Sequence, residues 1–226
     1  MNPWYHLGDR ASLPPQAPML GTSIQGKEEP TMIRGSETRK ADYPIDPLFL
    51  DRWSPRAMSG EEIPEQELML LFEAARWAPS AYNNQPWRFL YGRWGSEQWP
   101  LFFDLLVPGN RVWAKNAAAL VLIVSKTTFD HNGKPSITHS FDCGAAWGGL
   151  ALQGTLRGYV VHGMQGFDYE RARVTLAIPD DFRVEAMVAV GRPAPRETLP
   201  DELQQREAPS DRKKLAETVC EGKFRF

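Results

Sequence analysis

The sequence has few of the residues that build disulfides, metal sites or membrane spans. Its only cysteines are Cys143 and Cys220, too few for a disulfide framework or a cysteine-based zinc site. The four histidines are scattered without a His-x-x-x-His pair, which makes a structural metal improbable. The longest apolar run, Ala117–Val124, has eight residues, whereas a membrane-spanning helix needs about twenty. The first residues lack the order of a secretory signal, so we expect a soluble, cytoplasmic protein.

The chain also lacks a charge surplus and the common catalytic signatures. Its 26 basic and 28 acidic residues give a net charge of −2, which argues against a dedicated nucleic-acid binder. It has no Gly-x-Ser-x-Gly elbow, Walker loop or Gly-x-Gly-x-x-Gly motif. Cys143 is either a nucleophile or, more commonly for such surroundings, a buried free thiol. His162 is either an acid or base, or a hydrogen-bonded structural residue. An enzyme without an evident nucleophile, metal or triad usually takes its chemistry from a cofactor.

The chain divides into an extension and one domain. Residues 1–45 are rich in proline and show neither helical nor strand periodicity, which predicts a flexible or surface-wrapping extension. Met32 is an alternative start, and an arm that packs on a partner subunit is a second interpretation. Residues 46–226 have the regular patterning of a single domain.

Alternating helical and strand patterns predict a mixed α/β domain of three layers. Helical spacing or capping signals predict helices after Pro64, at Phe141–Arg157 with Gly158 as its cap, and from Asp168 to about Ala177. Strands are predicted at Trp87–Tyr91, Pro100–Val107, Ala117–Ser125, Val160–His162 and Glu185–Gly191, with a turn through Gly92 and Gly95 between the first two. In the helix Phe141–Arg157, a face of small residues predicts very close packing against another helix: Gly144, Ala145, Gly148 and Ala151.

Three polar clusters are candidates for chemistry. Arg52-Trp53-Ser54-Pro55-Arg56 suits an anion, because arginine forks pair with phosphate oxygens and serine adds a donor. The loop 78–87 carries serine, two asparagines and a glutamine between prolines, which suits the edge of a planar heterocycle. The run 211–215 is basic. Taken singly, each cluster also fits a turn or a solvated surface.

Further segments occur with these clusters in a fixed order along the chain. They are Arg52-x-Ser54-x-Arg56, Glu73–Trp87, Asn110–Ala117, Gly158 with Gln165–Asp168, Gly191-Arg192-Pro193, and Arg212-Lys213-x-Leu215. From about Asp46 to Val219, this order resembles the nitroreductase family, the FMN-dependent NAD(P)H oxidoreductases. The resemblance implies an α+β fold, a three-layer α-β-α sandwich whose central mixed sheet is flanked by helices. It also implies a homodimer with two FMN sites at its interface.

The resemblance assigns site residues to positions of this chain. Arg52, Ser54 and Arg56 would hold the FMN phosphate and the pyrimidine edge, Arg212 would also contact the phosphate, and Asn110 would contact the polar edge of the ring. The remaining candidates line the cofactor: Trp53, Pro79, Ser80, Asn83, Gln85, Gly163, Met164, Gln165 and Gly166. Of these, Pro79, Ser80 and Asn83 would come from the partner subunit, and the backbone of residues 163–166 would lie near the reactive nitrogen.

The implied activity is a ping-pong hydride cycle that passes reducing equivalents from NAD(P)H to a small acceptor. Nitroaromatics, quinones and activated alkenes all suit such a cycle, and the sequence does not choose between them. A flavin-binding storage or sensor protein is the alternative, and a flavin-free interaction module is a third interpretation. Trp53, Pro55 and Tyr82 depart from the usual family pattern, and Tyr82 would narrow the pocket.

Overall fold

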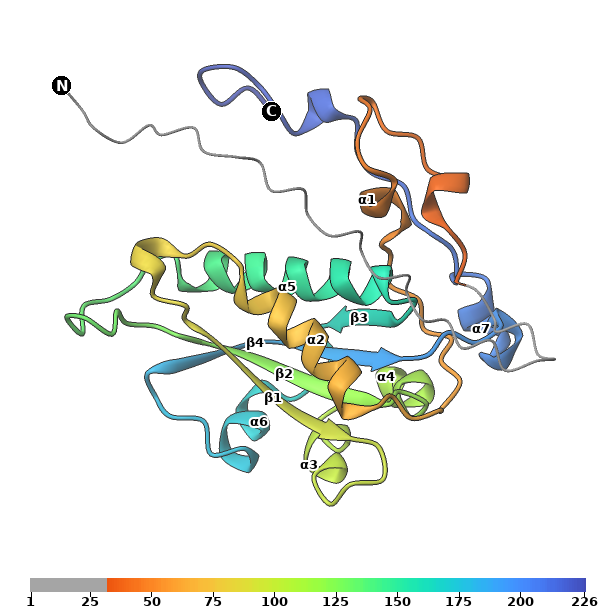
Figure 1. Ribbon diagram of the computed structural model, residues 1–226, viewed down its shortest axis with the longest axis horizontal. Coiled ribbons are helices and arrows are strands. Elements are labelled where there is room, and N and C mark those ends of the chain that lie inside the picture. Colours follow the sequence, from red (N-terminus) through yellow and green to blue (C-terminus); the bar gives the residue numbers. More distant parts are fainter. Residues whose placement is uncertain (1–31) are drawn as a thin grey trace, which may run out of the picture.

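A computed structural model describes residues 32–226 of the chain, with strands and helices arranged as in Figure 1. The strands are β1 (Trp87–Arg93), β2 (Ala119–Lys126), β3 (Val160–Met164) and β4 (Phe182–Gly191). The helices are α1 (Pro47–Asp51), α2 (Glu65–Arg76), α3 (Trp99–Phe103), α4 (Pro108–Ala114), α5 (His139–Leu156), α6 (Tyr169–Thr175) and α7 (Asp201–Gln204). Within residues 32–226, no helix has the length and hydropathy that a membrane span requires. The predictions about residues 1–31 lie outside the described part.

The four strands form one sheet in the order β1-β2-β4-β3, and every described neighbour pair is antiparallel. The mixed helix and strand content of the predicted α+β class is therefore confirmed, but the predicted mixed sheet is wrong for this part of the chain. The continuous apolar run in β2 does not distinguish a mixed sheet from an antiparallel one, because any strand that is covered on both faces has an apolar sequence. Seven of its eight residues are buried.

Hydrophobic clusters cover both faces of this sheet. On one face, α2 and α5 pack over Val121 and Val188, with Leu71 and Leu150 fully buried between them. On the opposite face, α3 and α6 lie under the sheet, as Figure 1 shows, and Leu122 is fully buried there. Each such buried side chain contributes about 1.5–3 kcal/mol relative to an exposed one. Both faces of the sheet therefore support the fold.

Helix α5 is the longest element and is capped as predicted. Gly158 has a φ of 73°, and the amide of Tyr159 donates to Gly154 O at 2.8 Å, which is the bonding of a Schellman cap. The predicted close packing occurs on a neighbouring stripe of the helix. A Cβ at Gly149 would lie 3.0 Å from the carbonyl oxygen of Ala74 in α2, whereas a Cβ at the predicted position Gly144 would meet nothing within 4 Å.

The strand predicted at Pro100–Val107 is wrong. The segment forms α3, whose first turn contains Pro100, followed by a turn that leads into α4. Proline suits a first helical turn because its missing amide would have no partner there. The helix packs closely on the sheet, since a Cβ at Gly92 of β1 would lie 2.7 Å from the Phe102 ring. The turn itself falls at Gly95, whose φ is 76°, rather than at Gly92.

The described part of the N-terminal segment packs on the start of the domain. The indole nitrogen of Trp53 donates to Ile33 O at 2.9 Å, and the amide of Ser36 donates to the carboxylate of Asp51 at 2.9 Å. The amide of Leu215 donates to Asp42 at 2.9 Å, so the segment before α1 runs beside the C-terminal segment (Figure 1). The division at residue 45 stays a prediction.

Candidate functional site

One cavity of about 580 Å³ lies between α5, the strands β2, β3 and β4, and the loop at residues 52–54. It is lined by Arg52, Ser54, Ile123, Ser140, Cys143, Gly144, Trp147, Gly148, Ala151, Gly163, Met164, Gln165, Glu185, Ala186 and Val188. Arg52, Ser54, Gly163, Met164 and Gln165 were predicted as site residues. Residues more than a hundred positions apart thus meet at one cavity.

Two further arginines, Arg39 and Arg212, lie close to Arg52. Burial lowers the pKa of Arg52, and the positive charge of Arg212 lowers it further. Burial also lowers the pKa of Arg39, with additional contributions from Arg212 and Arg52. Asp211 and Asp51 oppose this shift at Arg39 but do not cancel it, so positive charge is concentrated at this point, as an anion site requires.

Arg39 also shapes the backbone in front of the cavity. Its guanidinium donates to Leu50 O at 2.7 Å, to Arg52 O at 3.0 Å and to Ser210 O at 2.8 Å. The side chain of Arg52 donates to the hydroxyl of Ser54 at 3.4 Å. Sequence reasoning missed Arg39, because it lies in the irregular segment before the domain and no motif includes it.

Hydrogen bonds with His162 and Glu207 fix the loop at residues 54–57. Nδ1 of His162 lies 2.7 Å from Pro55 O, and because a carbonyl only accepts, this nitrogen carries the proton. Burial lowers the pKa of His162 to about 4, so the ring is neutral at pH 7. Glu207 accepts the amides of Arg56 at 2.6 Å and Ala57 at 2.8 Å. Of the two alternatives for His162, the hydrogen-bonded structural role is the one that the geometry shows.

Two predicted contacts of this loop point away from the cavity. The guanidinium of Arg56 lies 3.8 Å from Oε2 of Glu207, and Arg56 does not line the cavity. The indole of Trp53 is buried and bonded to Ile33 O. The side chains of Arg56 and Trp53 therefore stabilise the loop, and of its residues Arg52 and Ser54 line the cavity.

The end of β3 forms the next part of the cavity wall. A Cβ at Gly163 would lie 3.0 Å from the Trp147 ring, so glycine allows the strand to approach the indole closely. The side-chain amide nitrogen of Asn110 donates to Gly166 O at 3.0 Å. Asn110 and Gly166 do not line the cavity, and they instead fix the loop that carries Gln165.

The predicted loop at residues 79–85 lies apart from this cavity. Asn83 and Gln85 line a second, smaller hollow of about 380 Å³, and neither Pro79 nor Ser80 lines either one. Tyr82, Asn83 and Gln85 have φ values of 52°, 52° and 49°, in the left-handed region. For tyrosine and glutamine this backbone costs energy, and such strain often marks functional segments. Within one chain, the two predicted clusters are not brought together.

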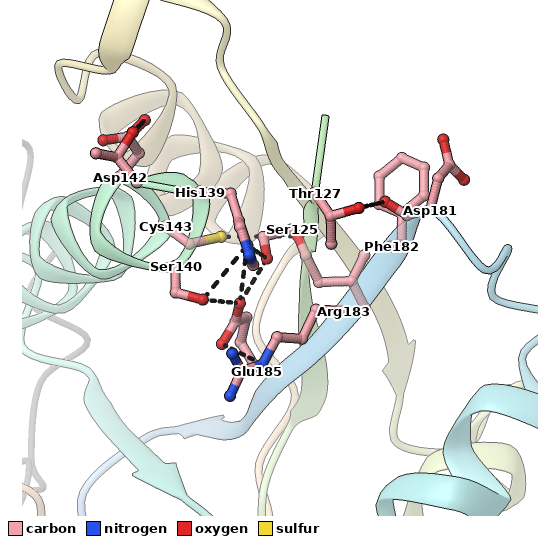
Figure 2. A network of polar contacts seen from close by, with 12 residues as sticks. Ser125, Thr127, His139, Ser140, Asp142, Cys143, Asp181, Phe182, Arg183 and Glu185 are labelled. Atoms are coloured by element: carbon pink, nitrogen blue, oxygen red, sulfur yellow. Dashed lines mark hydrogen bonds and ion pairs between the residues drawn. The ribbon is translucent and has the colours of Figure 1, made fainter. Parts of the chain in front are cut away.

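A polar network missed by the sequence analysis lies at the far wall of the cavity (Figure 2). Glu185 accepts the hydroxyls of Ser125 at 2.5 Å and Ser140 at 2.6 Å. Nδ1 of His139 lies 2.7 Å from the hydroxyl oxygen of Ser125. Glu185 was read only as the start of a core strand, because nothing local distinguishes its side chain from a solvated one.

Cys143 is a neutral part of this wall. Its side chain is 2% exposed, which confirms the buried thiol among the two alternatives. Burial, aided by the negative charges of Glu185 and Asp142, raises its pKa to about 12. At pH 7 the thiol is therefore protonated and a poor nucleophile. Across residues 32–226, no group of three or more His, Cys, Asp or Glu side chains is arranged to hold a metal ion.

Comparison with known proteins identifies relatives with this architecture. The nitroreductase family model matches residues 50–91. A solved structure described as an oxidoreductase containing FMN is 53% identical with a TM-score of 0.80, covering 83% of this chain and 96% of that one. An uncharacterised 15.4 kDa protein of Mycolicibacterium smegmatis is 30% identical over 61% of this chain and 97% of its own length. The fold recurs in a nitroreductase solved with FMN from Desulfovibrio desulfuricans, with 24% identity and a TM-score of 0.62 over 80% of this chain and 100% of that one.

Proposed function

Because the chain belongs to the nitroreductase family, we propose that it is an FMN-dependent oxidoreductase that passes reducing equivalents from NAD(P)H to a small acceptor. The acceptor class is a nitroaromatic, a quinone or an activated alkene. The chemistry supplied by bound FMN is hydride exchange, first from NAD(P)H and then to the acceptor, in ping-pong order. The observation that carries the proposal is the arginine cluster at the entrance of a cavity with a glycine-containing wall.

The residues present fit both the phosphate and the flavin ring of FMN. Burial and the positive charge of Arg212 lower the pKa values of Arg39 and Arg52, so a phosphate dianion would relieve the repulsion among the three arginines. Along the cavity, Cβ atoms at Gly144 and Gly148 would meet nothing within 4 Å, which leaves room for a planar ring beside α5. An apolar wall of this kind suits the burial of a flavin ring.

The chain's own residues bind and orient in this proposal. Arg52 and Ser54 would hold the cofactor, Arg212 would contact its phosphate, and the backbone of residues 163–166 would lie near the ring. His162, neutral at pH 7, keeps the loop of Ser54 in place without adding charge beneath it. Preorganised donors of this kind stabilise negative charge without reorganisation during the reaction.

The second half of the site comes, in this proposal, from another copy of the chain. Pro79, Ser80 and Asn83 lie away from the cavity of their own chain, as a contribution to a partner's site requires. Near them, Phe141 at the start of α5 is 79% exposed and Ile137 is 94% exposed. Exposed apolar side chains beside a helix of small residues favour a homodimer of three-layer subunits.

The test is the visible absorption spectrum of the purified protein, recorded before and after anaerobic addition of NADPH or NADH. We expect flavin bands that bleach with at least one nucleotide and return when an acceptor is added. Bands that persist with both nucleotides would instead support a storage or sensor protein. Absence of flavin after incubation with FMN would refute the proposal.

A further inference from the structure

Glu185 occupies an irregular position of β4, at the wall of the cavity. In the pairing with β2, Ile123 lies opposite Ala186 and Val124 lies opposite Val184, so Glu185 is the extra residue of a β-bulge. Bulges redirect side chains and are frequent beside active sites. Here Glu185 lines the cavity together with Ala186, instead of following strict alternation to the opposite face.

One oxygen of this carboxylate is fully used. Oε1 accepts the hydroxyl protons of Ser125 and Ser140. A hydroxyl has a single proton, so Ser125 accepts the proton of His139 Nδ1 while it donates to Glu185. Figure 2 shows these side chains converging on Glu185 from α5 and β2. The network fixes the orientation of the carboxylate.

The second oxygen has no hydrogen-bond donor among residues 32–226. The nearest charged group is Nε of Arg183, 3.8 Å from Oε2, beyond hydrogen-bond range. The side chain of Arg183 is 64% exposed, whereas that of Glu185 is 17% exposed. A ligand that enters the cavity and displaces water from Oε2 must therefore supply a donor, because an unpaired carboxylate oxygen is costly to desolvate.

The rest of this end of the cavity is neutral and mostly apolar. Trp147, Ile123 and Val188 line it, and the thiol of Cys143 is protonated at pH 7 because burial raises its pKa. These walls suit a planar, apolar ring.

The arginine cluster is at the other end. The cavity residue Gly163 pairs with Val188 of β4. Glu185 lies three residues before Val188 in the same strand, about 10 Å away at ~3.4 Å per residue. Arg52 lies near His162, whose pKa its positive charge helps to lower, and His162 pairs with Ala189, one residue further from Glu185 than Val188. The cavity therefore has a positive end and a negative end.

We propose that the Glu185 end is a binding subsite for planar rings that carry a positive charge or an N–H donor, and that it rejects anionic rings. The inference rests on the proposed function in one respect, that substrates enter this cavity. Glu185 is a specificity-determining residue in this scheme, with His139, Ser125 and Ser140 as positioning residues. A network that served only to attach α5 to the sheet would give no preference between ligands of opposite charge.

The experiment compares benzamidine and benzoate, two planar rings of similar size and opposite charge. Their dissociation constants for the FMN-loaded protein are measured by isothermal titration calorimetry. We expect benzamidine to bind at least about tenfold more tightly than benzoate, as a charge-assisted hydrogen bond allows. Glu185→Gln removes the charge and should reduce this ratio by at least about tenfold. Glu97→Gln removes an equal charge from an exposed turn, and should leave the ratio unchanged.

Several outcomes would overturn the proposal. They are equal or tighter binding of benzoate by the wild type, no measurable binding of either probe, or an unchanged ratio in Glu185→Gln. If that variant does not fold or load FMN, the wild-type ratio decides alone, and Ser140→Ala, which keeps the charge but removes one donor to Oε1, should still bind benzamidine more tightly than benzoate, with a smaller ratio. Bleaching of bound flavin by NAD(P)H reports separately on the proposed function, so the two failures are distinguishable.

The ring with an N–H donor has two possible sources, the nicotinamide carboxamide of the hydride donor and the acceptor itself. Stopped-flow measurement of the two half-reactions separates them. A higher half-saturating concentration in Glu185→Gln during flavin reduction assigns the subsite to the nicotinamide, and one during reoxidation assigns it to the acceptor. Unchanged values in both half-reactions would contradict the proposal.

Discussion

Replacing His162 with asparagine tests whether a buried neutral imidazole supports the loop in front of the cavity. The side chain is 8% exposed, and its Nδ1 donates to Pro55 O at 2.7 Å. Asparagine places an amide nitrogen near the position of Nδ1, so the hydrogen bond can remain. What the variant loses is the titratable group and the packing of the ring against Trp113, whose centroid lies 4.5 Å away.

The expected effect follows from the shift in pKa. Burial lowers the pKa of His162 from 6.5 to about 4, so the folded state binds fewer protons than the unfolded state between these values. Stability from this residue is therefore complete above pH 6.5 and is lost as the pH falls towards 4. Relative to high pH, this lowered pKa reduces the free energy of unfolding of the wild type by about 0.2 kcal/mol at pH 7 and by about 2 kcal/mol at pH 5. Loss of ring packing adds about 0.5–1.5 kcal/mol at any pH.

The assay is urea unfolding of wild type and His162→Asn at pH 7 and pH 5, at one protein concentration. The variant should be the less stable protein at pH 7, and the order should reverse at pH 5, because there the lowered pKa of His162 costs the wild type about 2 kcal/mol. His131→Asn, at an exposed histidine, controls for the loss of an imidazole elsewhere. A difference between wild type and variant that is the same at both pH values would refute the reasoning.

Further predictions concern the anion site and two packing positions. Arg52→Ala should weaken FMN binding about 10- to 150-fold, the equivalent of a lost charge-assisted contact of about 1.5–3 kcal/mol. Arg196→Ala, at an exposed turn, should leave FMN binding unchanged. Fluorescence titration with FMN measures the dissociation constants of both variants. Glu207→Ala leaves two loop amides without their acceptor and should lower the free energy of unfolding by about 2–4 kcal/mol in urea; a loss under 0.5 kcal/mol would contradict this. Gly154→Ala puts a Cβ 2.2 Å from Val161 Cγ2 and should lower the free energy of unfolding by about 1–3 kcal/mol. Gly144→Ala places its Cβ in open space and should leave stability unchanged or raise it. Equal melting temperatures of the two variants would contradict this account of the packing.

Predictions based on local signals agree with the structure. The helix predicted after Pro64 is α2, and its buried residues Leu68, Leu71 and Ala75 recur at helical spacing. Asp168 accepts the amide of Arg171 at 2.9 Å as the N-cap of α6. Such signals are reliable because the groups that interact are within one or two turns of each other.

The wrong predictions concern features that distant residues decide. The apolar segment 100–107 reads as a strand in the sequence, but its first part is helical and packs closely against β1. Close packing of α5 on α2 uses Gly149 and not Gly144, because the rotation of a helix depends on its partner. The apolar run of β2 does not specify the direction of its neighbours.

The sequence by itself determined the position of most elements, the family likeness, and the arginine and glycine motifs that point to a bound anion. Only the tertiary structure decided which of those residues share a cavity. Arg39 bonds Ser210 across 171 positions, and Glu185 meets Ser125 across 60. Periodicity and capping are properties of a few consecutive residues, whereas an electrostatic site is a sum over side chains that only folding brings within reach.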